Sequence, residues 1–261
     1  MAGAASLEEQ VEALRAGEAE LGVEGWTVVE VVGDDAERWL NDLVTADIAA
    51  LEPGGTVRAL LLGPTGRIRA DLLVHRRAPG PVLLQDGAQP RPIDELLQPY
   101  VLSSDVALRR PSSSFSVRPR VAGSFAVREG TPRGRVRPEA FESWRIRAGI
   151  PRFPPDLDED SLPAEAGLDR APVVAVDKGC YLGQEAVAKV RNLGHPPRVV
   201  LPVVGRHPLD AATEVFVDGE RVGRLTSLDV HGDRRSAIAR IRWDAKDSEL
   251  EAAGGVALAR R

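Results

Sequence analysis

The segment DKGCYLGQEAVAKVRNLG, residues 177–194, contains the single cysteine of a 261-residue chain. Lys178 lies two residues before Cys180, and a helical pattern of apolar residues begins at Gln184 and ends near Gly194. A neighbouring ammonium group and a helix N-terminus both stabilise a thiolate. A reactive thiol is therefore one interpretation of the local chemistry. The alternative is an inert, buried cysteine, which is common among free cysteines.

Other catalytic and metal-binding motifs are not found in the sequence. One cysteine cannot hold an iron–sulfur cluster, which normally takes four protein ligands, and the histidines lack the spacing of a metal-binding pair. The sequence has no phosphate-binding P-loop, no Gly-x-Gly-x-x-Gly fingerprint and no Gly-x-Ser-x-Gly nucleophile turn. We therefore predict no metal site.

Composition and charge restrict the class of protein further. The formal net charge of −5 disfavours direct binding of nucleic acid or of an anionic membrane, both of which need a basic surface. No apolar run approaches the roughly 18 to 20 residues that span a bilayer. The N-terminal segment lacks the features of a signal peptide, and a lone cysteine forms no intrachain disulfide. We expect a cytoplasmic protein.

Residues 1–195 show helical and strand patterns that interleave without a βαβ rhythm. This arrangement favours an α+β fold over a doubly wound sheet. We expect helices over 8–22, over 36–43 (capped by Asp34 and Asp35), within 93–102 (a short helix that stops near Pro99), over 141–147 and from 184. Strands are expected over 26–32, on both sides of the turn at 63–66, near 80–87 and within 103–130. After the helix over 141–147, the chain is rich in proline as far as residue 168. We expect this stretch to be an ordered loop with a functional role.

Residues 196–261 have a different pattern. Apolar and polar residues alternate on both sides of Asp218-Gly219, which is a strong signal for a β-hairpin. We therefore predict two domains, an α+β body over 1–195 and a small β-barrel or sandwich over 196–261.

Several segments together resemble a known family. KGCYLGQE, residues 178–185, is similar to the signature octapeptide of the YgfZ branch of the folate-binding family that also contains the glycine-cleavage T-protein, an aminomethyltransferase. The resemblance covers most of the chain. It continues in GDDAERWLNDLVTADIAAL, GPTGRIRADLLVHR, RIRAGIPRFPPD, VAKVRNLGHPPR and RVGRLTS.

This resemblance implies a ring-like fold, in which two intertwined α+β subdomains and a C-terminal β-barrel surround a central cavity that binds tetrahydrofolate. It implies a cytoplasmic accessory protein that supports iron–sulfur enzymes, including tRNA-modifying ones, and that uses its motif cysteine. The residues it assigns to reactive chemistry are Cys180, Lys178 and Asp71. Those it assigns to the cofactor are Tyr181, Gln184, Glu185, Arg145 and Gly149, with Tyr181 expected at the approach to the cavity.

Two positions depart from the T-protein pattern. A pair of acids in the T-protein hairpin is reduced here to Asp71, which could assist methylene transfer or could be a surface acid. Arg147 replaces a glutamate that accepts hydrogen bonds from the pterin, and a guanidinium has no acceptor atom. Arg147 is expected to be a solvated loop residue, or else to meet the glutamate tail of a folate. Pterin contacts could then come from Asp156, Asp158 or Glu165, although the acidic run 156–160 is more typical of a solvated face.

Three functions follow from these observations. The first is a tetrahydrofolate-binding accessory protein for iron–sulfur enzymes, which need not be an enzyme and which we expect to be a monomer. The second is a folate-dependent aminomethyltransferase or demethylase. The third is an interaction module that has kept the fold and lost the ligand.

Overall fold

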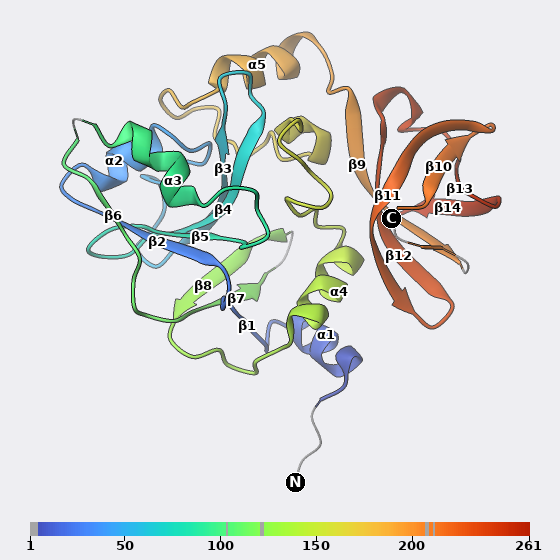
Figure 1. The fold of residues 1–261 in the computed structure, drawn as a ribbon, viewed down its shortest axis with the longest axis horizontal. Coiled ribbons are helices and arrows are strands. Elements are labelled where there is room, and N and C mark those ends of the chain that lie inside the picture. Colours follow the sequence, from blue (N-terminus) through green and yellow to red (C-terminus); the bar gives the residue numbers. More distant parts are fainter. Residues whose placement is uncertain (1–4, 103, 121–122, 207–208, 211) are drawn as a thin grey trace.

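The computed structural model describes residues 5–102, 104–120, 123–206, 209–210 and 212–261. Residues 103, 121 and 122 of the expected strand segment 103–130 lie outside the described residues. A mixed body and a separate C-terminal β-barrel lie on opposite sides of the molecule, with helix α4 and the proline-rich loop between them (Figure 1). The structure is α+β, as predicted.

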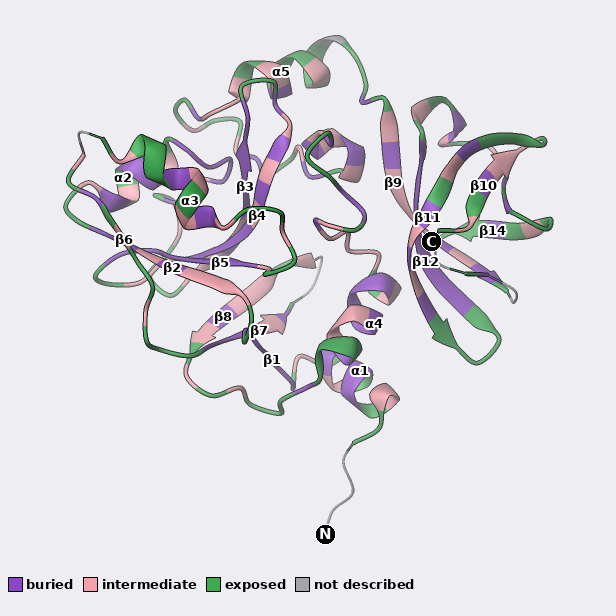
Figure 2. Cartoon of the chain, viewed as in Figure 1, coloured by how far each residue is buried: buried purple, intermediate pink, exposed green. Residues whose placement is uncertain are grey.

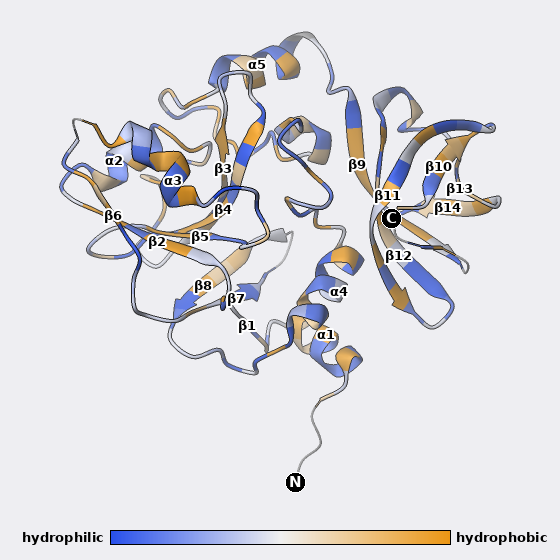
Figure 3. Cartoon of the chain, in the orientation of Figure 1, coloured by the Kyte–Doolittle hydropathy of each residue, from blue (hydrophilic) through white to orange (hydrophobic). Residues whose placement is uncertain are grey.

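The body is built on an antiparallel sheet in the order β3-β4-β5-β2-β6. Its strands are β2 (Thr27–Val32), β3 (Thr56–Leu62), β4 (Ile68–His75), β5 (Val82–Gln85) and β6 (Ala107–Arg109). Side chains alternate between the faces of a strand, so Ala70 and Leu72 of β4 enter one core, and Asp71 and Leu73 point to the other side. Figure 3 shows this mixture of hydrophobic and hydrophilic residues along β4.

Different elements cover the two faces of this sheet. The short helices α2 (Ala36–Asn41) and α3 (Ile93–Leu97), the latter followed by a 3-10 turn (Gln98–Tyr100), bury their apolar sides on one face. The other face packs against a three-stranded sheet of β1 (Leu21–Gly22), β7 (Phe115–Pro119) and β8 (Phe125–Glu129). Asp71 therefore lies on the face that looks toward this second sheet.

Helices α1 (Leu7–Arg15) and α4 (Pro138–Ala148) pack on each other below the sheets. The sequence prediction placed the end of α1 too late, at residue 22. The helix begins with a capping box between Ser6 and Glu9 and ends at Arg15, because the left-handed Gly17 (φ 73°) turns the chain away. The predicted side-chain cap of α2 was also wrong, since the Asp35 carboxylate instead accepts the Asp105 N–H at 3.0 Å.

The C-terminal residues close into a six-stranded barrel in the order β10-β11-β12-β9-β14-β13. Of the two predicted alternatives, the domain is therefore a barrel and not a sandwich. Its strands are β9 (Arg198–Arg206), β10 (Glu214–Val217), β11 (Glu220–His231), β12 (Arg234–Arg242), β13 (Leu250–Ala252) and β14 (Val256–Arg260), with a 3-10 turn at Trp243–Ala245. The hairpin at Asp218-Gly219 is confirmed, and both residues have positive φ (49° and 79°), as a tight two-residue turn requires. Figure 2 shows buried residues along β12.

The predicted helix after the cysteine motif is also confirmed. Helix α5 (Gln184–Leu193) begins at Gln184 and lies at the tip of the β3–β4 hairpin (Figure 1). A 3-10 turn (Pro163–Ala166) lies in the loop that crosses between the body and the barrel.

Candidate ligand-binding site

A cavity of about 470 Å³ lies between the sheets, α4 and the start of the crossing loop. We call it the central cavity. Its apolar wall includes the rings of Trp26, Phe125 and Phe141, and its polar wall carries acids and arginines from three separate chain segments. The polar residues that line it are Arg58, Asp71, Asp86, Gln89, Glu139, Glu142, Ser143, Arg145 and Arg152. Concave sites with apolar walls and a few polar groups are typical of small-molecule binding.

Asp71 and Arg58 form the innermost ion pair of this wall. Arg58 on β3 pairs in register with Leu73, so Asp71 is its diagonal neighbour on the same face. Arg58 Nε donates to Asp71 Oδ1 at 2.9 Å and its NH2 group donates to Oδ2 at 2.5 Å, while NH2 also donates to the Pro151 carbonyl. Burial lowers the pKa of Arg58, but the Asp71 charge more than offsets this and raises it. The Arg58 guanidinium therefore remains charged beside Asp71 at the cavity.

A glutamine fixes the backbone of Asp71 at the point where the neighbouring strand ends. β5 finishes at Gln85, which pairs with Leu72. The Gln89 side chain then takes the place of a strand residue: its Oε1 accepts the Asp71 N–H at 3.0 Å and its Nε2 donates to the Asp71 carbonyl at 2.7 Å. Gln85 supports Gln89 with a side-chain hydrogen bond at 3.3 Å. Asp71 thus occupies a defined position on a rigid element.

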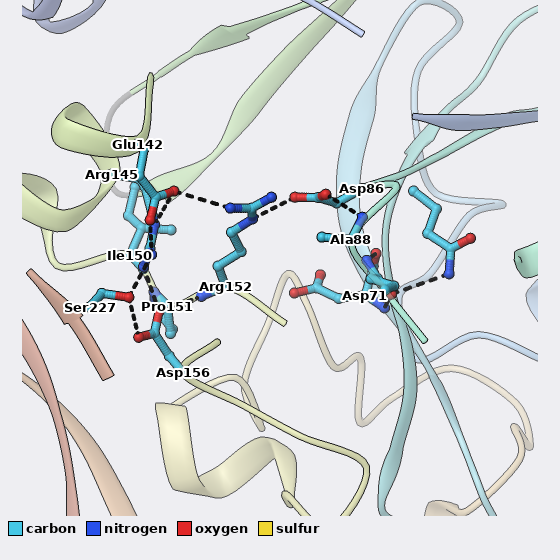
Figure 4. Close-up of polar contacts among 12 residues, drawn as sticks. Asp71, Asp86, Ala88, Glu142, Arg145, Ile150, Pro151, Arg152, Asp156 and Ser227 are labelled. Carbon is cyan, nitrogen blue, oxygen red and sulfur yellow. Dashed lines mark hydrogen bonds and ion pairs between the residues drawn. The ribbon is translucent and has the colours of Figure 1, made fainter. Parts of the chain in front are cut away.

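Arg152 connects acids on the two sides of the cavity (Figure 4). Its Nε donates to Asp86 Oδ2 at 2.6 Å, and its NH1 donates to Glu142 Oε2 at 3.3 Å. Asp86 follows β5 in the body, and Glu142 is on α4. Hydrogen bonding to Asp86 raises the pKa of Arg152, so the cation remains charged.

Arg145 continues this polar chain toward the barrel (Figure 4). It is almost fully buried, donates from Nε to Glu142 at 3.0 Å, and contacts Asp156 in the crossing loop. Its NH2 group also donates to Ser227 Oγ on β11 at 2.7 Å. A continuous series of polar contacts therefore runs from Asp86, through the side chains along the cavity, to Ser227 of the barrel. Arg145 lines the cavity as well as joining these parts.

The arrangement can bind a flat, polar ring system. Ionised carboxylates accept hydrogen bonds and retain free acceptor positions beyond those used by one arginine. Asp86 and Glu142 can thus accept N–H groups of a ligand, while the aromatic wall provides apolar contact. These two acids, with Arg58 and Arg152, were missed by the sequence analysis. The signal available for Glu142 was its helical spacing of three residues from Arg145.

The cysteine motif lies away from the central cavity. Among the described residues that line the cavity there is none from the segment 178–185. Gly183, at the start of α5, has φ 82°, and a Cβ there would lie 2.6 Å from the Gly63 carbonyl in the β3–β4 turn. Asp71 is five residues along β4 from Gly66 of that turn, a distance of about 17 Å along a strand. The motif therefore packs on the end of the hairpin opposite the cavity.

Each residue of the motif has a distinct environment. Cys180 is exposed, and Glu185 is exposed in the first turn of α5 with Gln184 beside it. Tyr181 is not at the expected position, because it is 7% exposed in a core that includes Leu60 and is not among the residues that line the cavity. Burial raises the pKa of Tyr181.

The Lys178 ammonium is hydrogen-bonded to the body and not to the thiol. Its ammonium donates to the carbonyls of Asn41 (2.5 Å), Val44 (2.5 Å) and Ala46 (2.8 Å) just after α2. An ammonium group has three N–H donors, so none remains for the sulfur of Cys180. Burial lowers the pKa of Lys178 to about 8. Lys178 fastens the motif loop to the body.

Arg147 is neither a solvated loop residue nor a residue of the central cavity. It lies on α4, with Nε 2.6 Å from Asp229 Oδ2 on the barrel and NH1 2.6 Å from Glu8 Oε1 on α1. Gly149 ends α4 in the left-handed conformation, and a Cβ there would lie 2.9 Å from Pro202 of β9. Both residues lie where the body meets the barrel.

The acidic run 156–160 is in part the expected solvated face, since Asp158, Glu159 and Asp160 are exposed, but Asp156 lies in an interface with the barrel. Asp156 is fully buried, accepting hydrogen bonds from Thr226 and Ser227 of the barrel. Asp158 pairs with Arg240 of β12 at 2.5 Å, and buried Glu165 pairs with Arg240 and Arg198. Because arginines and hydroxyls of the barrel already occupy them, these acids are not the alternative pterin ligands that the sequence suggested.

The described ranges contain neither a metal-binding cluster nor a membrane-spanning helix. No group of three or more His, Cys, Asp or Glu residues there could hold a metal ion. No described helix is long and apolar enough to cross a membrane.

Comparison with known proteins identifies the class of fold. The family model described as the GCVT N-terminal domain matches residues 3–119. The crystal structure of glycine cleavage system aminomethyltransferase T from Bartonella henselae superposes with a TM-score of 0.78, covering 97% of this chain and 88% of that chain at 17% identity. The chain thus has the aminomethyltransferase fold.

One curated relative shares a shorter stretch. The chain is 35% identical over 85 residues to the heme-dependent oxidative N-demethylase gamma subunit of Ectopseudomonas mendocina (strain ymp). The match spans 33% of this chain and 23% of that subunit. It therefore covers less than a quarter of the relative's length.

Proposed function

We propose that this protein binds tetrahydrofolate, or a derivative, in the central cavity. The observation that carries the proposal is the cavity itself, where carboxylates held by arginines face an aromatic wall in an aminomethyltransferase fold. The ring N–H groups of a reduced pterin need acceptors, which Asp86 and Glu142 supply. Trp26 and Phe141 supply apolar surface for the ring. The residues present therefore fit the group, which when bound supplies amine nitrogens that carry a one-carbon unit.

Asp71 and Arg145 take different roles toward such a ligand. The Asp71 carboxylate places negative charge beside the ring amines, held in position by Arg58 and Gln89. Arg145 orients the Glu142 side chain, because its Nε donates to that carboxylate at 3.0 Å. Gly149 lets α4 end closely against the barrel and has no direct place in the cavity wall.

The proposed biological role is that of an accessory protein of the YgfZ type, which supports assembly or maintenance of iron–sulfur enzymes, including tRNA-modifying ones. The similarity of residues 178–185 to the YgfZ octapeptide supports it, as does the exposure of Cys180. A thiol at the surface can reach a partner protein. The hydrogen bonds of Lys178 to the body hold the motif loop in place. We propose that this body (residues 1–195) and barrel (196–261) act as a cytoplasmic monomer without direct contact to nucleic acid.

The second candidate is a folate-dependent aminomethyltransferase or demethylase. The aminomethyltransferase fold and the demethylase-subunit relative favour it. However, both oxygens of Asp71 are engaged by Arg58. Asp71 is thus part of a structural ion pair, which favours the accessory role over proton transfer at this carboxylate.

Calorimetric titration with tetrahydrofolate tests the cavity. We expect saturable binding by the protein and at least tenfold weaker binding by Glu142→Gln, which removes about 1.4 kcal/mol or more of interaction. Glu52→Gln, an exposed acid before β3, is the matched control and should bind like the unaltered chain. If millimolar tetrahydrofolate gives no heat, the protein does not bind folate, and the interaction module is the function that remains. Turnover of an aminomethylated lipoyl carrier would select the transferase.

A further inference from the structure

A second cavity, of about 920 Å³, adjoins the central cavity and is markedly basic. It lies between the end of α1, the end of β7, the end of α4 and the crossing loop, and shares Arg58, Ile150 and Pro151 with the central cavity. Its charged lining consists of Arg15, Arg58, Arg118, Arg120 and Arg170. We call it the arginine cavity. Among its described lining residues there is no aspartate or glutamate.

The chain as a whole makes this concentration of positive charge unusual. The formal net charge is −5, with 39 acids against 34 lysines and arginines, and most arginines of the body–barrel interface are paired. Arg58 is neutralised by Asp71, and Arg15 lies 3.5 Å from Glu12. Within the described ranges, the remaining three arginines of the cavity form no ion pair, and Arg118 has only the Gly17 carbonyl at 3.4 Å.

Unpaired guanidinium groups around one concavity attract anions strongly. Coulombic attraction is greater in a partly enclosed space than in bulk water. The planar guanidinium also matches carboxylate and phosphate groups with paired hydrogen bonds. Three such groups at separate positions select a ligand with several negative charges over a single small anion. A volume of about 920 Å³ admits a small molecule of that kind.

We infer that the arginine cavity is a binding site for an oligoanion, a small molecule that carries several carboxylates or phosphates along one chain. Arg118, Arg120 and Arg170 are its recognition residues. Arg58 forms the boundary with the central cavity, where its charge is already committed to Asp71. The inference does not require that the central cavity bind folate.

Calorimetric titration with two probes, tetraglutamate and tripolyphosphate, tests this site. The variant is Arg120→Gln/Arg170→Gln, because both side chains are exposed and their removal leaves no buried vacancy. The control is Arg38→Gln/Arg224→Gln, which removes the same charge from exposed positions outside the cavity. We expect at least tenfold weaker binding of one or both probes by the cavity variant and less than twofold change by the control.

The pattern of binding identifies the ligand chemistry. Binding of tetraglutamate alone assigns a polycarboxylate, binding of tripolyphosphate alone assigns a phosphate ligand, and binding of both supports the shared oligoanion chemistry. Equal loss in the two double variants would mean general attraction to surface charge and would overturn the inference. So would absence of binding by both probes at low ionic strength, where charge attraction is least screened. Tetrahydrofolate is titrated separately, so failure of either site is recognised independently.

Discussion

The guanidinium of Arg58 engages both carboxylate oxygens of Asp71, at 2.9 and 2.5 Å, and forms part of the wall of two cavities at once. The pair is nearly buried, with side-chain exposures of 10% and 11%. It separates a cavity that contains acids from one lined by arginines. One cross-strand pair on β3 and β4 therefore sets the electrostatic boundary between the two candidate sites.

Removing one member of this pair should be costly. Asp71→Asn leaves the Arg58 charge buried and without its counter-ion, so we expect a loss of about 2 to 4 kcal/mol in the free energy of unfolding. Asp94→Asn is the control, because its partner Arg110 is more than half exposed and the loss should be below about 1 kcal/mol. Urea unfolding of the two variants measures the difference. Equal, small losses would show that Arg58 does not depend on Asp71.

Cys180 should behave as an accessible thiol. Because the residue is exposed, we expect reaction with a thiol reagent in the folded protein at a rate close to that in denaturant. Cys180→Ala should change the free energy of unfolding by less than about 0.5 kcal/mol. The same variant should fail to restore iron–sulfur enzyme activity in a strain that lacks the native factor. Full restoration would remove Cys180 from the proposed function.

The two glycines of the motif should respond differently to alanine. Gly183 has φ 82° and no room for a Cβ, so Gly183→Ala should destabilise the protein by about 2 kcal/mol or more. Gly179 has open space around the position of a Cβ and no positive φ, so the backbone there does not need glycine. Gly179→Ala should leave the melting temperature unchanged. Destabilisation of both variants alike would contradict this packing of the motif on the hairpin.

Local sequence signals were sufficient for much of the fold. The start of α5 follows from the apolar spacing after Gln184, and the β10–β11 hairpin follows from Asp218-Gly219, whose positive φ values few other residue pairs accept. Both depend on residues that are close in the chain. The resemblance of separate motifs added the arrangement of body and barrel, which local patterns do not contain.

The side-chain environment of the site depended on tertiary packing. A helix over 141–147 was predicted, and its periodicity already separates Arg147 from Arg145 and Glu142, because residues two or five apart lie about 200° or 140° apart around a helix. Which side faces the cavity is decided only when α1 and the barrel supply Glu8 and Asp229. The environments of Asp158 and Glu165 were not predicted for the same reason, since their arginine partners lie in the barrel.

The attachment of the barrel to the crossing loop should weaken in acid. A hydrogen bond from Arg240 lowers the pKa of Asp158 to about 2, with burial opposing the shift. Because the folded-state pKa lies below the ordinary value of 3.8, the carboxylate stabilises the folded protein above about pH 4. That contribution is lost as the pH falls from about 4 to 2. Asp158 is 52% exposed, so we expect solvent to limit it to about 1 kcal/mol.

Asp158→Asn isolates this contribution from other acids. Glu20 has a pKa of about 2 in the body, where burial raises it and hydrogen bonds from Arg128, the Arg133 N–H and Ser116 more than offset that effect, so the unaltered chain loses stability in the same range for a second reason. The difference in unfolding free energy between the unaltered chain and Asp158→Asn should be about 1 kcal/mol near pH 7 and should vanish near pH 2. Asp247→Asn, an 83% exposed acid of the barrel, should show no difference at either pH. A difference for Asp158→Asn that stays constant with pH would mean that the Arg240 pair does not hold this carboxylate ionised.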